Sequence, residues 1–344
     1  MSAPVKKRFE ELDALRGIAV LMVVVFHYTS RYDEVYPGRE LGFSFAQGHF
    51  GVELFFMISG FVILFSLERV KTARSFVLAR ISRLYPPYWC AVIFTFLIVS
   101  CFSLPGRERT WMEALINLTM IQRLFSVADV DGVYWSLAIE MAFYGVLCLC
   151  LVCKLLPRLY AVTSVWLIGM LLVNISPVFP EGSYVLKVLK MGLLLEHATL
   201  FVLGMMFYKL HQKESQVKIY TVIALALVVQ YAVHGLVNGL FTTLFVFVFY
   251  LFCIEKLTFL VRWPFLFLGH VSYSLYLIHQ NLGYIIIRYF EEQNLSPLWA
   301  ILTATGVSLS VAFVMYFYIE QKLCRWLKQK LESWSASQER VKIH

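Results

Sequence analysis

The sequence contains little charge, and we identify in it no low-complexity tract and no internal repeat. Asp, Glu, Lys and Arg make up 15% of the 344 residues, whereas hydrophobic residues make up 60%, and the mean hydropathy is +0.71. Soluble domains carry about 25% charged residues, so this composition excludes an ordinary soluble domain. It indicates a polytopic membrane protein that forms a single domain over residues 1–344.

Cysteine usage gives no indication of a disulfide framework. The seven Cys residues are an odd number, and almost all of them fall in apolar segments or on the side that we expect to face the cytoplasm. The run CLCLVC at residues 148–153 contains a C-x-x-C spacing. Within a continuous apolar segment, this spacing is more typical of helix packing than of metal binding. We therefore predict no metal site.

Apolar runs of about 17 to 25 residues recur along the chain, and each is long enough to cross a hydrocarbon core of about 30 Å as a helix. We predict an all-α polytopic membrane helix bundle of about ten transmembrane helices over residues 12–319, followed by a cytoplasmic basic tail, residues 320–344. The predicted helices span residues 12–31, 50–68, 86–103, 133–153, 159–175, 185–208, 218–234, 237–254, 265–287 and 298–319.

The positions of Lys and Arg predict the orientation, because these residues accumulate in cytoplasmic loops. With the N-terminus inside, 21 of the 30 Lys and Arg residues fall in inside segments, eight fall in outside segments, and Arg16 lies in the first helix. An even number of helices with both termini in the cytoplasm fits this count. The net charge of +8 is then a topology signal near anionic lipid headgroups, and we predict no nucleic-acid binding. The N-terminus resembles a signal peptide but lacks a small-residue cleavage site, so we expect the first helix to be retained.

The first predicted helix, LDALRGIAVLMVVVFHYTS, carries ionisable residues in an otherwise apolar run. Arg16 and His27 are eleven residues apart, so on a helix they differ by about 20° in direction and about 16 Å in height. Asp13 stands three residues before Arg16, where an acid and a base can pair. A neutralised Asp13–Arg16 pair, with His27 capping the outer end, explains the stripe in structural terms. An ionisable residue inside the membrane is nevertheless a functional-site hypothesis by default.

Other predicted helices also carry ionisable residues, which favours one shared polar cavity. Glu53 lies in GHFGVELFFMISGFVI, Glu140 in VYWSLAIEMAFY and His279 in HVSYSLYLIHQ. An interfacial belt of aromatic residues explains most of the 19 Tyr residues, but it does not explain their clustering with Ser, Glu and His. We also expect RLFSVADVDGVYW, at the end of the long outer loop 104–132, to lie over an outward-facing pocket. Polar and aromatic residues at helical spacing in these segments are Ser59, Trp135, Ser136, Tyr144, Ser272 and Tyr276.

Six motifs in sequence order resemble the integral membrane acyltransferase-3 family. They are LDALRGIAVLMVVVFH, GVELFFMISGFVI, LARISRLYPPYW, VYWSLAIEMAFY, SYSLYLIH and YFYIEQKLCRW, and together they extend over nearly the whole chain. The resemblance implies transfer of an acyl group, usually acetyl, from acyl-coenzyme A to a hydroxyl of a carbohydrate or other extracytoplasmic acceptor. It places the family's paired Arg and His at Arg16 and His27, and its R-x-x-R signature at Arg80 and Arg83.

The sequence departs from the family pattern in two places. Glu320 is followed by Gln321 and Lys322, where the family often has a basic residue and Pro, so we assign no role to that end. We also find no esterase-like domain of the kind that some members append. We therefore expect this chain, or a separate partner, to complete the transfer.

For the chemistry, His27 is the expected general base, since neutral imidazole can accept a proton from a sugar hydroxyl; an acetyl-imidazole intermediate is the alternative. Glu140 or Glu53 is expected to orient His27, as a buried carboxylate does in a catalytic triad. Arg16 is expected to align the donor or to hold Asp13. The predicted substrate pocket contains Asp13, Glu53, Trp135, Ser136, Tyr144, Tyr276 and His279.

Arginines on the cytoplasmic side are expected to bind the donor. Arg80 and Arg83 share a helical face and suit the 3′-phosphate and diphosphate of coenzyme A, with Arg74 as an auxiliary; the positive-inside bias alone also accounts for their charge. A pantetheine arm is about as long as the Arg16 to His27 distance, so it fits along the apolar stretch between them. Acetyl-coenzyme A is thus a cosubstrate, and we expect no permanently bound cofactor.

We place the protein in the bacterial inner membrane, in contact with membrane lipid and with a carbohydrate acceptor such as O-antigen, exopolysaccharide or a glycolipid. One alternative is a transporter, because polar groups in several helices also describe substrate pathways. Another is acylation of a small lipophilic molecule such as a macrolide. The sequence leaves open the acceptor, the acyl chain length and the oligomeric state.

Overall fold

The computed structural model describes residues 9–37, 42–70, 72–175, 186, 190 and 192–341, and within these residues all regular structure is helical. The prediction of an all-α bundle is therefore confirmed. The helices are α1 (Glu10–Phe26), α2 (Tyr32–Val35), α3 (Gly51–Leu67), α4 (Ala73–Phe102), α5 (Trp111–Asn117), α6 (Trp135–Val152), α7 (Leu159–Ile175), α9 (Ala198–His211), α10 (Gln216–Cys253), α11 (Trp263–Glu292), α12 (Pro297–Met315) and α13 (Cys324–Val341). Shorter helical segments are η1 (His27–Arg31), η2 (Ala46–Phe50), η3 (Gln122–Phe125), η4 (Gly132–Tyr134), η5 (Leu156–Arg158), η6 (Thr258–Leu260) and η7 (Tyr316–Leu323).

Seven helical segments in the described part of the chain are long and apolar enough to cross a membrane. This finding confirms an integral membrane helix bundle, whereas the count of ten helices and the cytoplasmic position of both termini stay predictions. Part of the predicted helix 185–208 lies outside the described residues, and its described remainder is the short apolar helix α9. The seven segments are Glu10–Val35, Ala46–Leu67, Ala73–Phe102, Gly132–Val152, Leu156–Ile175, Gln216–Cys253 and Pro297–Leu331.

Helix α10 consists of two antiparallel helices joined at Gly235. The Tyr231 hydroxyl lies 3.0 Å from Thr243 Oγ1, although twelve residues of straight helix would separate them by about 18 Å. Gly235 has φ +79° and ψ −177°, a conformation that is open to glycine and strained for other residues. The reversal accounts for the two helices predicted at residues 218–234 and 237–254.

Helix α4 begins 13 residues before the predicted start at residue 86. The Thr72 hydroxyl caps its N-terminus by accepting a hydrogen bond from the backbone N–H of Ser75, at 3.2 Å. The helix continues through Pro86 and Pro87, although proline inside a helix removes a hydrogen bond and usually breaks it. The segment before the prolines is consequently part of the bundle and not a loop.

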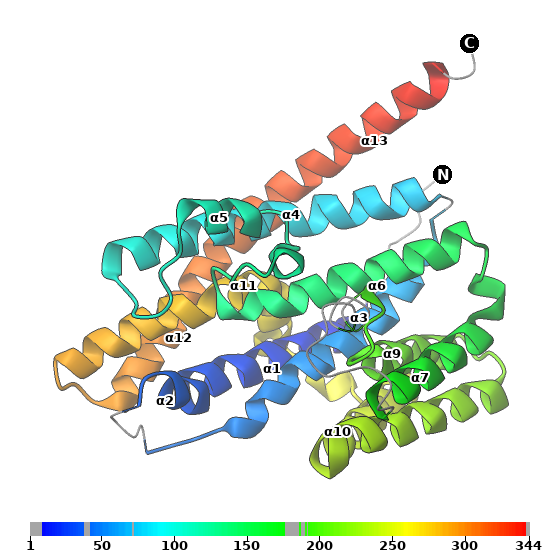
Figure 1. Cartoon of the computed structure of the whole chain (residues 1–344), viewed down its shortest axis with the longest axis horizontal. Coiled ribbons are helices and arrows are strands. Elements are labelled where there is room, and N and C mark those ends of the chain that lie inside the picture. The colour runs from blue at the N-terminus through cyan, green and yellow to red at the C-terminus, as the bar shows by residue number, and fades with distance from the viewer. Residues whose placement is uncertain are drawn as a thin grey trace.

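Helix α1 lies in the middle of the bundle, with α11 packed closely against it (Figure 1). A Cβ atom added at Gly269 of α11 would lie 2.0 Å from the backbone oxygen of Asp13, and one added at Gly17 of α1 would lie 2.6 Å from that of Phe265. The two main chains are therefore in direct contact, as small residues permit between membrane helices. This contact fixes α11 beside the Arg16 to His27 stripe of α1.

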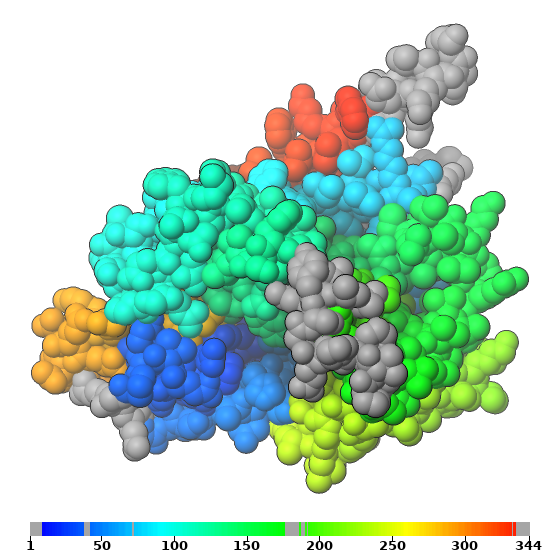
Figure 2. Space-filling model, viewed as in Figure 1, coloured from blue at the N-terminus to red at the C-terminus, as the bar shows by residue number. Residues whose placement is uncertain are grey.

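The ends of the bundle differ. At one end, the loop 104–132 (cyan to blue-green in Figure 2) packs beside the residues that close α1 and form α2, and the Tyr36 hydroxyl donates to the backbone oxygen of Pro105 at 3.0 Å. At the other end, α13 extends away from the bundle, next to the start of α4 (Figure 1). Arg74 of α4 stacks on the Trp334 ring of α13, with 4.9 Å between the guanidinium carbon and the ring centroid.

Candidate active site

A polar cavity of about 120 Å³ lies around Arg16 inside the bundle, and we call it the Arg16 cavity. Its walls come from α1, α3, α4, α6, α11 and η7. Three guanidinium groups and two carboxylates share this space. The expectation of one shared cavity is wrong, because Glu140 lines this cavity whereas His27 lines a second one. Its polar and charged lining residues are Arg16, Ser59, Arg80, Arg83, Ser136, Glu140, Tyr144, His270, Ser272, Tyr273, Tyr276 and Glu320.

Two charged residues of the Arg16 cavity, Arg16 and Glu140, have hydrogen-bond partners among the described residues. Arg16 Nη1 donates to Asp13 Oδ1 at 3.2 Å, so the predicted pairing of the two is confirmed. Glu140 accepts a hydrogen bond from Ser59 Oγ at 2.9 Å and a second from the Tyr144 hydroxyl. A carboxylate held by two hydroxyl donors is fixed in place, which is how a buried charge is tolerated.

The arginines of α4 keep free donors in the Arg16 cavity. Arg80 Nη2 donates to Ser66 Oγ at 2.7 Å, but its buried Nε has no hydrogen-bond partner among the described residues. Arg83 is exposed and lines the cavity. In the same cavity, Glu320 of η7 accepts a hydrogen bond from Ser274 Oγ at 2.5 Å. An anion entering this cavity would thus meet unpaired guanidinium donors.

A second cavity, of about 480 Å³, lies around His27, and we call it the His27 cavity. The loop 104–132 forms much of its wall, so the expectation that the end of this loop covers a pocket is confirmed. The two cavities lie at opposite ends of the stripe on α1. The lining residues are Phe26, His27, Arg31, Arg107, Arg109, Arg123, Ala128, Asp129, Gly132, Trp135 and Gln280.

His27 is hydrogen-bonded to a second histidine, and the network defines its tautomer. His279 Nδ1 lies 3.1 Å from the backbone oxygen of Leu275 and 3.0 Å from that of Tyr276, so it carries the proton and leaves Nε2 as an acceptor. His27 Nδ1 lies 3.1 Å from this Nε2 and 2.9 Å from the backbone oxygen of Val23, so it also carries a proton. This assignment leaves Nε2 of His27 as the ring nitrogen that can accept a proton from a substrate.

Ser136 and Tyr276 connect the two cavities. Ser136 Oγ and the Tyr276 hydroxyl are 2.7 Å apart, and both residues line the Arg16 cavity. The residue before Ser136, Trp135, lines the His27 cavity, and the backbone oxygen of Tyr276 accepts the His279 proton. A molecule that extends from one cavity to the other has to pass this hydrogen-bonded pair.

The histidine partner corrects the expectation that a glutamate orients His27. Glu140 lies five residues after Trp135, about 7.5 Å further along α6 and about 140° around it, and so it faces the Arg16 cavity. Glu53 faces Thr242 of α10, and its Oε2 has no hydrogen-bond partner among the described residues. The place expected for a carboxylate beside His27 is occupied by His279.

The predicted pocket residues divide between the two cavities. Asp13 is hydrogen-bonded to Arg16 of the Arg16 cavity, and His279 is hydrogen-bonded to His27 of the His27 cavity. Glu53 and the expected auxiliary Arg74 line neither cavity. Arg74 instead stacks on α13, because α4 continues as a helix and turns that side chain outward. The sequence reasoning missed His270, Tyr273 and Glu320 in the Arg16 cavity, and Arg31, Arg107, Arg109, Arg123 and Gln280 in the His27 cavity.

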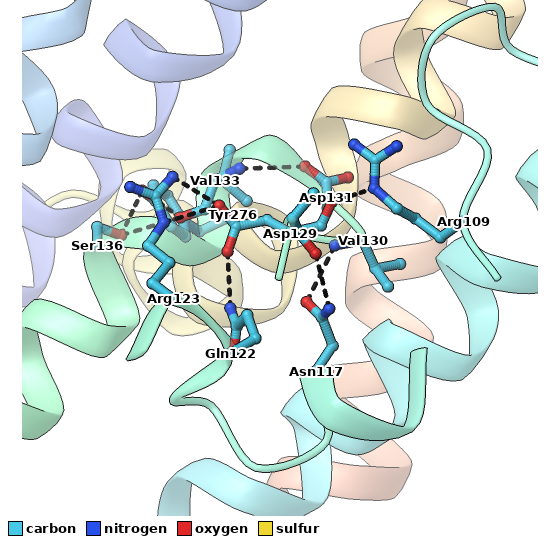
Figure 3. Close-up of polar contacts among 11 residues, drawn as sticks. Arg109, Asn117, Gln122, Arg123, Asp129, Val130, Asp131, Val133, Ser136 and Tyr276 are labelled. Carbon is cyan, nitrogen blue, oxygen red and sulfur yellow. Dashed lines mark hydrogen bonds and ion pairs between the residues drawn. The ribbon is translucent and has the colours of Figure 1, made fainter. Parts of the chain in front are cut away.

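Hydrogen bonds hold the loop 104–132 over the His27 cavity (Figure 3). Asn117 is fully buried; its amide donates to the backbone oxygens of Glu113 and Ala128, and its Oδ1 accepts from Val130 N–H at 3.0 Å. Asn281 of α11 donates its side chain to the backbone oxygen of Val130 at 2.9 Å. The cavity wall is therefore tied to the same helix that carries His279.

Burial raises the pKa of Asp131, in this loop, to about 6, although the backbone N–H groups of Asn281 and Val133 act in the opposite direction. In contrast, the pKa of the exposed Glu108 is lowered, chiefly because backbone N–H groups and Ser103 hydrogen-bond its carboxylate. Both carboxylates thus have partners other than arginine.

The seven long apolar helical segments of the described chain, with two polar cavities beside α1, define the class: an integral membrane protein with a polar site inside its helix bundle. A family described as an acyltransferase domain matches residues 9–317. The chain belongs to this family, the acyltransferase-3 family.

Two curated relatives match parts of the chain. Over 111 residues, the chain is 33% identical to Protein 2 in picA locus of Rhizobium radiobacter; the match covers 31% of this chain and 53% of that protein. Over 152 residues, it is 28% identical to Acyltransferase MdmB of Streptomyces mycarofaciens, covering 40% of this chain and 38% of that protein. The chain thus spans about half or less of these relatives. No solved structure matches it significantly.

Proposed function

We propose that this protein transfers an acetyl or other acyl group from acyl-coenzyme A to a hydroxyl of an extracytoplasmic carbohydrate, and that it does so in a bacterial inner membrane. The donor occupies the Arg16 cavity, the acceptor enters the His27 cavity, and His27 is the general base. The observation that carries the proposal is the hydrogen-bonded His27–His279 pair, which leaves a free imidazole nitrogen in a cavity of its own. Family membership favours transfer over the transporter alternative.

The donor site is supported by the charges of the Arg16 cavity. Coenzyme A is a polyanion, and guanidinium groups bind phosphate oxygens through paired, charge-assisted hydrogen bonds. Arg80 and Arg83 provide such groups on adjacent turns of α4, and Arg16 adds a third guanidinium nearer the centre of the bundle. From Arg16, the thioester has to extend about 16 Å along α1 to reach His27, past Ser136 and Tyr276.

The chemistry follows from the tautomer of His27. Its Nε2 accepts the proton of the acceptor hydroxyl while the hydroxyl oxygen attacks the thioester carbonyl. The tetrahedral intermediate then collapses, the C–S bond breaks, and the imidazolium returns its proton to the departing coenzyme A thiolate. Base catalysis of this kind is worth about 10² to 10⁴ in rate. His279 acts as a positioning residue, because its Nε2 accepts the Nδ1 proton of His27 throughout.

The test is transfer of label from radiolabelled acetyl-coenzyme A, supplied only to the cytoplasmic face of membrane vesicles that contain candidate glycan acceptors. We expect wild type to label extracytoplasmic glycan and His27→Ala to reduce labelling by at least about 10². His49→Ala is the matched control, since His49 is exposed and lines neither cavity. Appreciable labelling by folded His27→Ala would refute the role of the base. Uptake of an unmodified substrate, without labelling, would support transport instead.

A further inference from the structure

The His27 cavity is strongly cationic, although it lies at the end of α1 that the charge distribution assigns to the outside. Arg31, Arg107, Arg109 and Arg123 line it together with Asp129, which gives four guanidinium groups against one carboxylate. Outer loops are normally poor in Lys and Arg, because the bias favours the cytoplasmic side. Topology therefore gives no reason for this cluster.

Only some of these arginines are neutralised. Arg123 is paired with Asp129, with Nη2 and Nε at 2.6 and 2.9 Å from Oδ2 (Figure 3). Arg31 is paired with Glu34 at 2.7 Å. Arg109 donates to backbone oxygens, including that of Asp129 at 3.0 Å, and these contacts fix its position without cancelling its charge.

Arg107 has no ion pair with a carboxylate among the described residues. Its guanidinium carbon lies 5.7 Å from the centroid of the Tyr284 ring, a contact with an aromatic face that does not neutralise the charge. The carboxylate that interacts with it electrostatically is that of Asp131, whose oxygens accept backbone N–H groups of Val133 and Asn281. Arg107 therefore has no carboxylate in direct contact among the described residues, and Asp131 offsets its charge only from a distance.

The positive charge bears directly on the proposed chemistry. A base that becomes a cation during transfer is disfavoured by neighbouring cations, and Arg31 and Arg107 line the same cavity as His27. A negatively charged group on the acceptor would offset this effect and would at the same time pair with the free guanidinium. The loop that carries the arginines is fixed by Asn117 and Asn281, so the cationic surface is preorganised.

We infer that the acceptor is an anionic carbohydrate, with a carboxylate or phosphate group near the hydroxyl that is modified, and that Arg107 binds this group. The inference rests on the proposed function, because it assigns the His27 cavity to the acceptor. The shared chemistry is an oxyanion that accepts guanidinium hydrogen bonds. Arg109 contributes a second positive charge, and Arg31 and Arg123 complete the wall.

The test measures binding to purified protein in nanodiscs of neutral phosphatidylcholine. The probes are methyl glucuronide, glucose 6-phosphate and the neutral methyl glucoside, each titrated by calorimetry. We expect at least one anionic sugar to bind about tenfold or more tightly than the glucoside, as a charge-assisted hydrogen bond contributes. Arg107→Gln should remove this preference and Arg107→Lys should retain part of it. Arg288→Gln is the control, because Arg288 is an outer-side arginine paired with Glu292 that lines neither cavity.

The outcomes separate this inference from the proposed function. Equal binding of charged and neutral sugars, or an anion preference unchanged in Arg107→Gln, would overturn the inference even where His27-dependent transfer is intact. Transfer that persists in folded His27→Ala, with the Arg107-dependent preference intact, would support anion binding and count against the proposed chemistry. The last measurement uses nanodiscs that contain the anionic lipid phosphatidylglycerol. If no sugar shows an Arg107-dependent preference in neutral nanodiscs, and phosphatidylglycerol is retained by wild type but not by Arg107→Gln, the cavity binds a lipid headgroup, and the acceptor assignment is wrong.

Discussion

Replacement of His279 by Phe is expected to slow acyl transfer while leaving donor binding unchanged. The ring of His279 is fully buried, and its Nε2 accepts the Nδ1 proton of His27. Phe keeps a flat ring in this place and removes the acceptor. The cost in folding stability is expected to be limited, because His27 Nδ1 keeps the backbone oxygen of Val23 as an acceptor and is not left unpaired.

The size of the effect follows from one hydrogen bond. A hydrogen bond to a charged group contributes about 1.5–3 kcal/mol, and His27 becomes charged only as the acceptor hydroxyl is deprotonated. Each 1.36 kcal/mol of lost transition-state stabilisation is a factor of ten in rate, so kcat should fall by about 10- to 160-fold. The lower part of this range is expected, because the backbone oxygen of Val23, 2.9 Å from His27 Nδ1, still holds the tautomer.

The assay is steady-state transfer of labelled acetyl in proteoliposomes, with kcat and the donor KM measured separately. His279→Gln is the matched variant, since its side-chain oxygen can accept the His27 proton and should restore part of the rate. A purely structural role for His279 predicts no such rescue. The reasoning fails if kcat of folded His279→Phe is within about twofold of wild type, or if the donor KM changes in place of kcat.

Two further predictions concern the donor and the packing of the bundle. The double variant Arg80→Ala with Arg83→Ala should raise the donor KM by about 10- to 100-fold, through loss of charge-assisted hydrogen bonds, and should lower the rate at saturation far less. The control is Arg158→Ala, which changes an exposed arginine outside both cavities. An unchanged donor KM in the double variant would exclude anchoring of the donor by these arginines. Gly269→Ala should lower stability by about 1–3 kcal/mol or more, because its Cβ would overlap the main chain of α1. Thermal unfolding in detergent measures this loss of stability. Gly306→Ala is the control and is expected to be neutral, because a Cβ atom added there lies in open space. Equal melting temperatures of Gly269→Ala and wild type would contradict the direct helix contact.

Much of the fold is predictable because a membrane helix has to be apolar over a fixed length. The predicted helices 50–68, 133–153 and 159–175 agree with α3, α6 and α7 to within about two residues at each end. The start of α4 is not predictable in this way. Pro86 and Pro87 favour a helix that begins there, and only tertiary packing carries the helix through them.

The candidate site is predictable where it depends on a single helix. The Asp13–Arg16 pair follows from a spacing of three residues. His27 and His279 are 252 residues apart in sequence, so each can be identified as an intramembrane ionisable residue while their hydrogen bond cannot. The arginines of the loop 104–132 carry a usable signal, because the predicted topology places them on the side where Arg is disfavoured. A count of charges alone treats these arginines as exceptions.

The contact between Gly17 and Gly269 has a consequence for how substrates enter. This contact fixes the distance between His27 and His279, because it joins the main chains of α1 and α11. Main chains cannot change their packing as side chains do. Sliding α11 along α1 by one residue would move His279 by about 1.5 Å, enough to break its hydrogen bond with His27. These two helices therefore have to move as a single unit during turnover. If the proposed donor and acceptor occupy these cavities, the opening that admits them must then come from the other walls: α3, α4, α6 and η7 for the Arg16 cavity, and the loop 104–132 for the His27 cavity.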